Sequence, residues 1–139
     1  MGLDVIFYKL KNVRKDKDES IKTLDEYIDI CQEGSEDLCC LHGMNFIYKY
    51  FLSRLTNERC IVTREDILDI KERCEKIFID STLAEKLFPV EKEFNSGIYG
   101  PIDYGVAYFK KLKICRNEMS LLLNKFSEDK DILYVQMSW

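Results

Sequence analysis

The sequence predicts one helix-rich α+β domain, residues 1–139, in which a small antiparallel sheet pairs the N-terminal and C-terminal strands. Residues 3–10 and 132–139 are rich in β-branched and aromatic residues, which favour strands, and mainly helical sequence separates them. Strands at opposite ends of a chain satisfy their backbone groups when they pair with each other, so a sheet of two or three strands is expected. The 139 residues, 46% of them hydrophobic, are enough for the core of a single domain.

Two helices are predicted in the first half of the chain. The first shows helical spacing of apolar residues from Ile21 to Cys31, and Gly34 suits the left-handed cap that often ends a helix. The second is predicted from about 36 to 55, with an apolar face that Asn45 interrupts. A buried amide has to be hydrogen-bonded, so Asn45 is interpreted as a bridge to a neighbouring backbone, with a ligand contact as the alternative. The predicted face consists of Leu38, Leu41, Asn45, Tyr48, Phe51, Leu52 and Leu55.

Capping signals locate the elements that follow. Thr63 and the acid three residues later approximate a capping box, which predicts the start of a third helix. The preceding residues 60–62 can supply a short extra strand. Thr82 and Glu85 repeat the pattern for a short helix, which ends before Pro89 because the residue preceding a proline is pushed out of the helical region.

Residues 94–105, F-N-S-G-I-Y-G-P-I-D-Y-G, predict an ordered aromatic loop. The segment holds three of the six glycines and one of the two prolines. Glycine permits positive φ and Pro101 fixes φ, so one definite backbone shape is expected. Ordered loops on a rigid scaffold are where binding residues concentrate, and this loop is therefore the leading candidate site.

The last helix is predicted from about 103 to 126, with Asp103 at its start to complement the helix dipole. One side of this helix is basic, beside Tyr104 and Tyr108, and is the best electrostatic candidate for an anionic ligand, although a solvated helix face is the more common interpretation. The basic residues are Lys110, Lys111, Lys113 and Arg116. The candidate ligand-binding or partner-binding residues are Asn45, Tyr48, Tyr99, Gly100, Asp103, Tyr104, Tyr108 and Lys111.

Charge and hydropathy exclude several classes of partner. The chain has 25 acidic and 21 basic residues, and this negative balance argues against general affinity for nucleic acid or anionic membranes. No secretory signal or membrane span is visible in the sequence, so a cytoplasmic protein with reduced cysteines is expected. The charged run 9–19 is interpreted as a solvated connection, with phosphate contact as the alternative.

The sequence contains little sign of catalysis or metal binding. It has one histidine and none of the common nucleophile, nucleotide-binding or zinc-protease motifs. Cys39, Cys40 and His42 form the only cluster with metal-site chemistry, but their spacing matches no familiar zinc pattern. Residues two or three apart on a helix seldom present a nucleophile and a base in line. We therefore expect packed thiols, with no metal, no cofactor and no catalytic residue.

Five short motifs follow one another along nearly the whole chain. They are Met1-Gly2-Leu3-Asp4 before the first strand; Asn45, Ile47 and Phe51; residues 62–66 with Cys74; Leu87-Phe88-Pro89 leading to residues 97–100, Tyr104 and Tyr108; and the closing Ser138-Trp139. In this order they resemble a family of small uncharacterised proteins of bacteriophages, prophages and bacterial genomes. The resemblance implies a phage or mobile-element context and no established activity. Relatives often carry a tryptophan, a basic pair and a histidine in the second helix, and an aspartate after the loop tyrosine, where this chain has Leu41, His42-Gly43, Tyr48 and Gly105.

These observations predict a non-catalytic protein that binds a host protein, with counter-defence as its purpose. The alternative is a protein that binds a small anionic ligand such as a nucleotide, through the aromatic loop and the basic side of the last helix. A cryptic hydrolase is a third, weaker interpretation. A deep pocket lined by Asn45, Tyr48, Tyr99 and Tyr104 would favour the small ligand, and an exposed surface rich in tyrosine would favour the protein partner.

Overall fold

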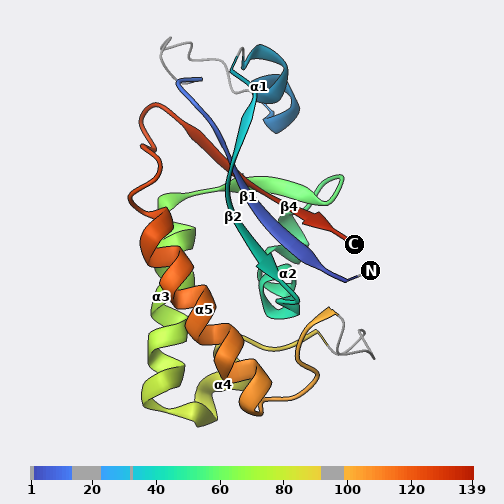
Figure 1. Ribbon diagram of the computed structural model, residues 1–139, viewed down its shortest axis with the longest axis vertical. Helices are drawn as coiled ribbons and strands as arrows, with labels where there is room; N and C mark the ends of the chain where they lie inside the picture. Colours follow the sequence, from blue (N-terminus) through green and yellow to red (C-terminus); the bar gives the residue numbers. More distant parts are fainter. Residues whose placement is uncertain (1, 14–22, 32, 92–98) are drawn as a thin grey trace.

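The two strands from the ends of the chain lie side by side at the centre of a four-stranded antiparallel sheet (Figure 1). Strands β1 (Asp4–Leu10) and β4 (Ile132–Ser138) pair in register over their whole lengths. Strands β2 (Ser35–His42) and β3 (Arg59–Val62) form the two edges, which gives the order β2-β1-β4-β3. The predicted α+β class and the pairing of the terminal strands are confirmed, but the expected two or three strands are too few, because β2 and β3 add an edge strand on each side of the terminal pair.

The computed structural model describes residues 2–13, 23–31, 33–91 and 99–139. Ile21, residues 14–19 of the charged run and residues 94–98 of the aromatic loop lie outside these ranges, and so do the predictions that concern them. The helical elements are α1 (Leu24–Ile30), α2 (Asn45–Phe51), η1 (Leu52–Arg54), α3 (Arg64–Ile79), η2 (Ser81–Leu83), α4 (Ala84–Leu87) and α5 (Val106–Leu122). No helix in the described ranges is long and apolar enough to cross a membrane.

The first half of the predicted helix 36–55 is wrong, because residues 35–42 form strand β2. Side chains alternate along this strand: Cys39 and Leu41 are buried, whereas Cys40 and His42 are exposed. This period of two fits a sheet edge that pairs with β1, and the long-range pairing overrides the helical spacing of the apolar residues. Gly43 ends the strand with a φ of 61°, and the helix begins only at α2.

Only some of the predicted cap signals are confirmed: α1 ends at Ile30 with Cys31 and not Gly34 as its C-cap, and α5 begins at Val106 after Gly105, so Asp103 lies outside its first turn. Thr63 forms the predicted capping box with Asp66: its hydroxyl accepts the Asp66 N–H at 3.1 Å, and its N–H donates to the Asp66 carboxylate at 2.9 Å. The extra strand predicted at 60–62 is β3. The short helix before Pro89 is present, but Asp80 and not Thr82 supplies the side-chain cap, because its carboxylate accepts the Thr82 N–H at 3.1 Å.

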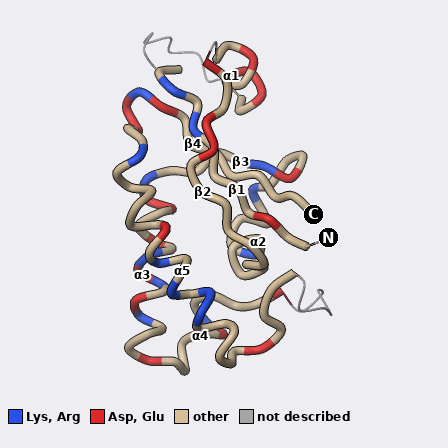
Figure 2. The backbone as a smooth tube through the Cα atoms, viewed as in Figure 1, with Lys and Arg blue, Asp and Glu red and all other residues tan. Residues whose placement is uncertain are grey.

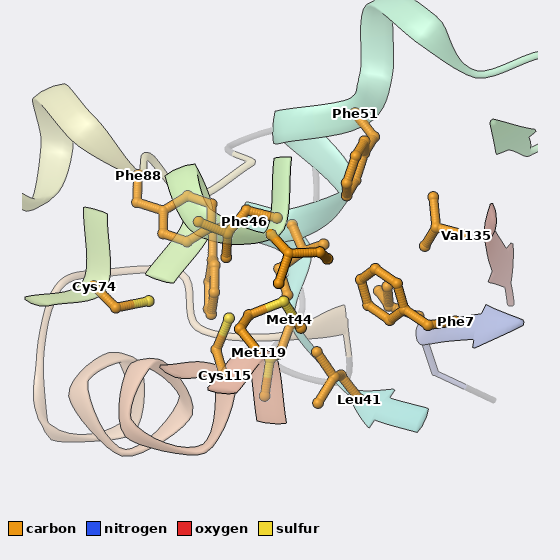
Figure 3. Packing of buried hydrophobic residues seen from close by; sticks show 14 of the residues in the cluster. Phe7, Leu41, Met44, Phe46, Phe51, Cys74, Phe88, Cys115, Met119 and Val135 are labelled. Carbon is orange, nitrogen blue, oxygen red and sulfur yellow. The ribbon is translucent and has the colours of Figure 1, made fainter. Parts of the chain in front are cut away.

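The main core lies between one face of the sheet and helices α2, α3 and α5. Aromatic rings fill its centre: Phe46 meets Phe88 edge-to-face with ring centroids 4.8 Å apart, and Phe7 meets Phe51 at 6.5 Å (Figure 3). Each large buried side chain of this kind contributes about 1.5–3 kcal/mol. On the other sheet face, α1 covers a smaller cluster of Leu10, Ile132 and Tyr134.

Candidate functional site

Asn45 fastens the aromatic loop to the start of α2. Its side chain is fully buried, and its amide nitrogen donates to the carbonyl oxygen of Pro101 at 2.9 Å. The other amide atom, Oδ1, has no hydrogen-bond partner among the described residues. The interpretation of Asn45 as a bridge to a neighbouring backbone is therefore confirmed.

Gly100 reinforces this connection by close backbone packing. Its φ is 129°, and a Cβ atom there would lie 2.3 Å from the carbonyl oxygen of Gly43. Only glycine fits such an approach without a shift of one of the two backbones. The loop thus reaches α5 along a fixed path across the turn between β2 and α2.

The four predicted tyrosines separate into two pairs. Tyr48 and Tyr99 both contact the Trp139 ring edge-to-face, with centroids 5.2 and 5.7 Å away. The Trp139 indole N–H donates to the Glu58 carboxylate at 2.9 Å. These rings cover the end of β4 and hold the loop against the sheet.

The second pair, Tyr104 and Tyr108, belongs to α5 and the turn before it. Tyr108 is fully buried, its hydroxyl donates to the Phe88 carbonyl oxygen at 2.7 Å, and burial raises its pKa. Tyr104 contacts the Tyr108 ring at 5.0 Å and accepts the Val90 N–H on its hydroxyl at 3.2 Å. Tyr108 therefore acts as a core anchor, and Tyr104 remains half-buried at the surface.

Three further predicted residues, Gly100, Asp103 and Lys111, line a cavity of about 430 Å³ between the β2–α2 turn and α5. The Lys111 ammonium group donates to the His42 carbonyl oxygen at 2.7 Å. The Asp103 carboxylate accepts the Gly105 N–H at 3.1 Å. Among the described residues, Lys111 is the only lysine that lines this cavity, and the Asp103 carboxylate shares it, so these lining residues lack the positive balance that a phosphate group needs. The eight predicted residues therefore do not form a single site.

A second surface feature gathers apolar and basic side chains where the end of α3 meets the start of α5. We call it the apolar depression; its volume is about 590 Å³, and it is lined by Phe78, Tyr104, Gly105, Val106, Phe109, Lys110 and Lys113. Val106 is 74% exposed and Phe78 is 40% exposed. Figure 2 shows basic residues along α5. Tyr104 is the one residue of the predicted site that lines it.

Lys110 and Lys113 form a basic rim of this depression. Among the described residues, neither Lys110 nor Lys113 forms an ion pair. Arg116, one turn further along α5, places its guanidinium carbon 5.6 Å from the centroid of the Phe78 ring. Three of the four predicted basic residues, Lys110, Lys113 and Arg116, therefore lie beside this apolar surface, whereas Lys111 lines the other cavity. Phe78 of α3 was not among the predicted site residues.

Cys39, Cys40 and His42, which are close in sequence, lie on opposite faces of strand β2. Cys39 points into the core, with its sulfur 3.5 Å from the Glu118 carboxylate, whereas Cys40 and His42 lie on the outer face. Asp4 of the neighbouring strand joins them, and its carboxylate lies 2.6 Å from the His42 Nδ1 atom. The ligand atoms of Asp4, Cys40 and His42 all lie within 4.8 Å of one another.

Burial keeps several thiols protonated. It raises the pKa of Cys39 to about 12, with the Glu118 carboxylate as a second cause, and it raises the pKa of Cys60 to about 11. The pKa of Cys115 lies well above the usual range, because Cys74 hydrogen-bonds to it and both are buried. Thiols of this kind are poor nucleophiles near neutral pH, so their chemistry is that of packing residues.

Comparison of the chain with protein-family models, with curated proteins and with solved structures finds no match.

Proposed function

We propose that the protein is a non-catalytic, cytoplasmic binding protein of phage or mobile-element origin that engages a host protein, with counter-defence as its purpose. The apolar depression is the single observation that carries the binding proposal. Exposed apolar patches with a polar rim are typical of protein interaction sites. Origin and purpose rest on the resemblance of the ordered sequence motifs to phage and prophage proteins.

The chemistry of the depression specifies the partner surface. Phe78, Val106 and Phe109 offer apolar contact, so the partner presents at least one apolar or aromatic side chain. Lys110 and Lys113 favour carboxylates at the edge of that contact. An amphipathic acidic segment, such as a helix with glutamates beside leucine or phenylalanine, meets both requirements.

The depression is also well supported by the core beneath it. Ile77 and Cys74 of α3 and Leu112 and Cys115 of α5 are all fully buried between the two helices. A surface built on packed helices loses little conformational entropy on binding, which leaves more of the contact energy for affinity. The two exposed apolar side chains, Phe78 and Val106, are the expected anchors.

Capture from host lysate with matched variants tests this proposal. Val106→Asp places a carboxylate in the depression, and Leu121→Asp places one at another exposed position of the same helix. We expect wild-type protein and Leu121→Asp to enrich the same host protein, measured by mass spectrometry, and Val106→Asp to lose it. Equal enrichment by both variants would contradict the assignment of the depression.

A small anionic ligand remains the second candidate, because the same depression combines aromatic rings with lysines. The rings of Tyr104 and Phe109 offer surface on which a base can stack, and Lys110 and Lys113 offer charge for a phosphate. Titration calorimetry with nucleotides separates the two candidates. Saturable nucleotide binding that Lys110→Glu abolishes, without capture of a host protein, would favour the small ligand.

A further inference from the structure

The outer face of the sheet brings three different metal-ligating side chains together. Strand register places Asp4 directly opposite His42 and Ile6 opposite Cys40. Neighbouring positions of both strands, such as Val5 and Leu41, are buried in the core on the other face. Because side chains alternate along a strand, Asp4, Cys40 and His42 must share the outer face.

We propose that Asp4, Cys40 and His42 form a binding site for a divalent transition-metal ion of the zinc class. A thiolate, an imidazole and a carboxylate are all established kinds of zinc ligand, and this mixed set favours zinc over magnesium or calcium, which take oxygen ligands. Three protein ligands leave a coordination position for water or for a ligand from a partner. The site shares no residue with the apolar depression, so the two proposals stand or fall separately.

The backbone around the three residues is held firmly. β1 pairs on both sides, with β2 and with β4, so Asp4 lies on an inner strand of the sheet. Immediately after His42, the Gly43 N–H donates to the Leu3 carbonyl oxygen at 2.7 Å, which closes the pairing beside the cluster. The ligands therefore come from a rigid pair of strands, which is a good platform for a site.

The side chains need only a small adjustment to enclose an ion. The His42 Nδ1 and Asp4 Oδ1 atoms lie at a hydrogen-bonding distance of 2.6 Å, whereas two such ligands on a tetrahedral zinc ion lie about 3.3 Å apart. The side chains of His42 and Asp4 are 73% and 44% exposed, so both can rotate without displacing the core. On binding, the Cys40 thiol releases its proton to solvent and coordinates as the thiolate.

Two nearby carboxylates favour a cation at this position, and the Lys111 ammonium group, which donates to the His42 carbonyl oxygen, acts against them. Among the described residues, Asp4 and Asp37 supply the negative charge that acts on the Cys40 sulfur. Asp37 belongs to the same edge strand and is exposed. A divalent cation is attracted by both carboxylates, and only Asp4 is placed to coordinate it directly.

Titration of the full chain with Co²⁺ tests the proposal, because a cysteine thiolate bound to cobalt gives a charge-transfer absorption in the near ultraviolet. We expect wild-type protein to develop this band at one equivalent and Zn²⁺ to displace it. Cys40→Ser should abolish the band, whereas Cys31→Ser, at a partly exposed thiol elsewhere, should retain it. Asp4→Asn and His42→Ala should each weaken Zn²⁺ binding at least about tenfold.

Circular dichroism of each variant distinguishes loss of the ligand from loss of the fold. Cys40 and His42 are exposed, so variants at these positions should keep the wild-type spectrum and thermal transition. A thiolate band that survives Cys40→Ser would overturn the proposal. So would the absence of any band in folded wild-type protein, or equal Zn²⁺ affinity in the wild type and His42→Ala.

Discussion

The side-chain amide of Asn45 donates to the carbonyl oxygen of Pro101 across 2.9 Å, within the core. This hydrogen bond joins the first turn of α2 to the loop that leads into α5. It explains why a polar residue stands in a helix whose neighbouring residues Phe46 and Ile47 are completely buried. The bond is thus part of the support for the start of α5, where Val106 and Lys110 line the apolar depression.

Replacement of Asn45 by alanine should destabilise the protein. The Pro101 carbonyl oxygen would lose its buried partner, which costs about 1–3 kcal/mol. Urea denaturation measures this cost as a fall in the free energy of unfolding. Asn117→Ala, at an exposed position of α5, is the matched control and should change stability by less than about 0.5 kcal/mol. Equal effects at the two positions would show that the bridge contributes nothing.

Two glycines with positive φ provide a test of the loop path. Gly34 has a φ of 74°, and a Cβ atom added there would meet nothing within 4 Å, whereas a Cβ on Gly100 would lie 2.3 Å from the Gly43 oxygen. Gly34→Ala should cost about 1–2 kcal/mol, from backbone strain alone. Gly100→Ala should cost clearly more, because strain and collision add. Thermal denaturation compares the two, and a similar loss in both variants would contradict the close approach.

Deletion of residues 134–139 should abolish cooperative unfolding. The deletion removes most of β4, which pairs with both β1 and β3, and it takes away the buried side chains of Val135 and Met137. Removal of Trp139 alone is the control, since this residue lies beyond the strand and is 41% exposed. We expect the shorter deletion to keep a sigmoidal thermal transition and the longer one to lose it. A cooperative transition in the longer deletion would argue against the central pairing.

The pKa values of the buried thiols predict a loss of stability at alkaline pH. Burial raises the pKa of Cys60 from 9.0 to about 11 and that of Cys39 from 9.0 to about 12. The folded state therefore retains protons that the unfolded state releases above about pH 9. The corresponding stability is fully present below pH 9 and is lost as pH rises to about 11–12. Urea denaturation from pH 8 to 11 should show this fall, and it should be smaller in Cys60→Ala measured against its own value at pH 8.

Much of the fold could be predicted because its signals are local or terminal. The β-branched and aromatic residues at the two chain ends favour strands, and the capping box at Thr63 marks the start of a helix, whatever the rest of the chain does. Strand β2 could not be recognised in this way, since residues 38 and 41 also fit a helical stripe and only pairing with β1 decides between the two patterns. A signal was present in the alternation of Cys39, Cys40, Leu41 and His42, which is short but has the period of a strand.

The incorrect helix prediction for the residues of β2 also concealed the cluster of Asp4, Cys40 and His42. On a helix, residues 40 and 42 point in different directions, whereas on a strand they share a face. Asp4 was missed because its place beside His42 depends on pairing across 38 positions of sequence. For the apolar depression, Tyr104 and the lysines were found from their charge and aromatic character. Phe78 was not found in this way, because the exposure of its side chain depends on how α3 and α5 pack against each other.

The affinity of the captured host protein for matched variants is the most direct test of the central claim, that the apolar depression is the binding surface. Titration calorimetry would compare wild-type protein with Val106→Asp and with the control Leu121→Asp. We predict that Val106→Asp weakens binding by about 1–4 kcal/mol, as expected for an interface anchor, and that Leu121→Asp leaves the dissociation constant unchanged. Wild-type affinity in Val106→Asp, with the same fold by circular dichroism, would contradict the claim.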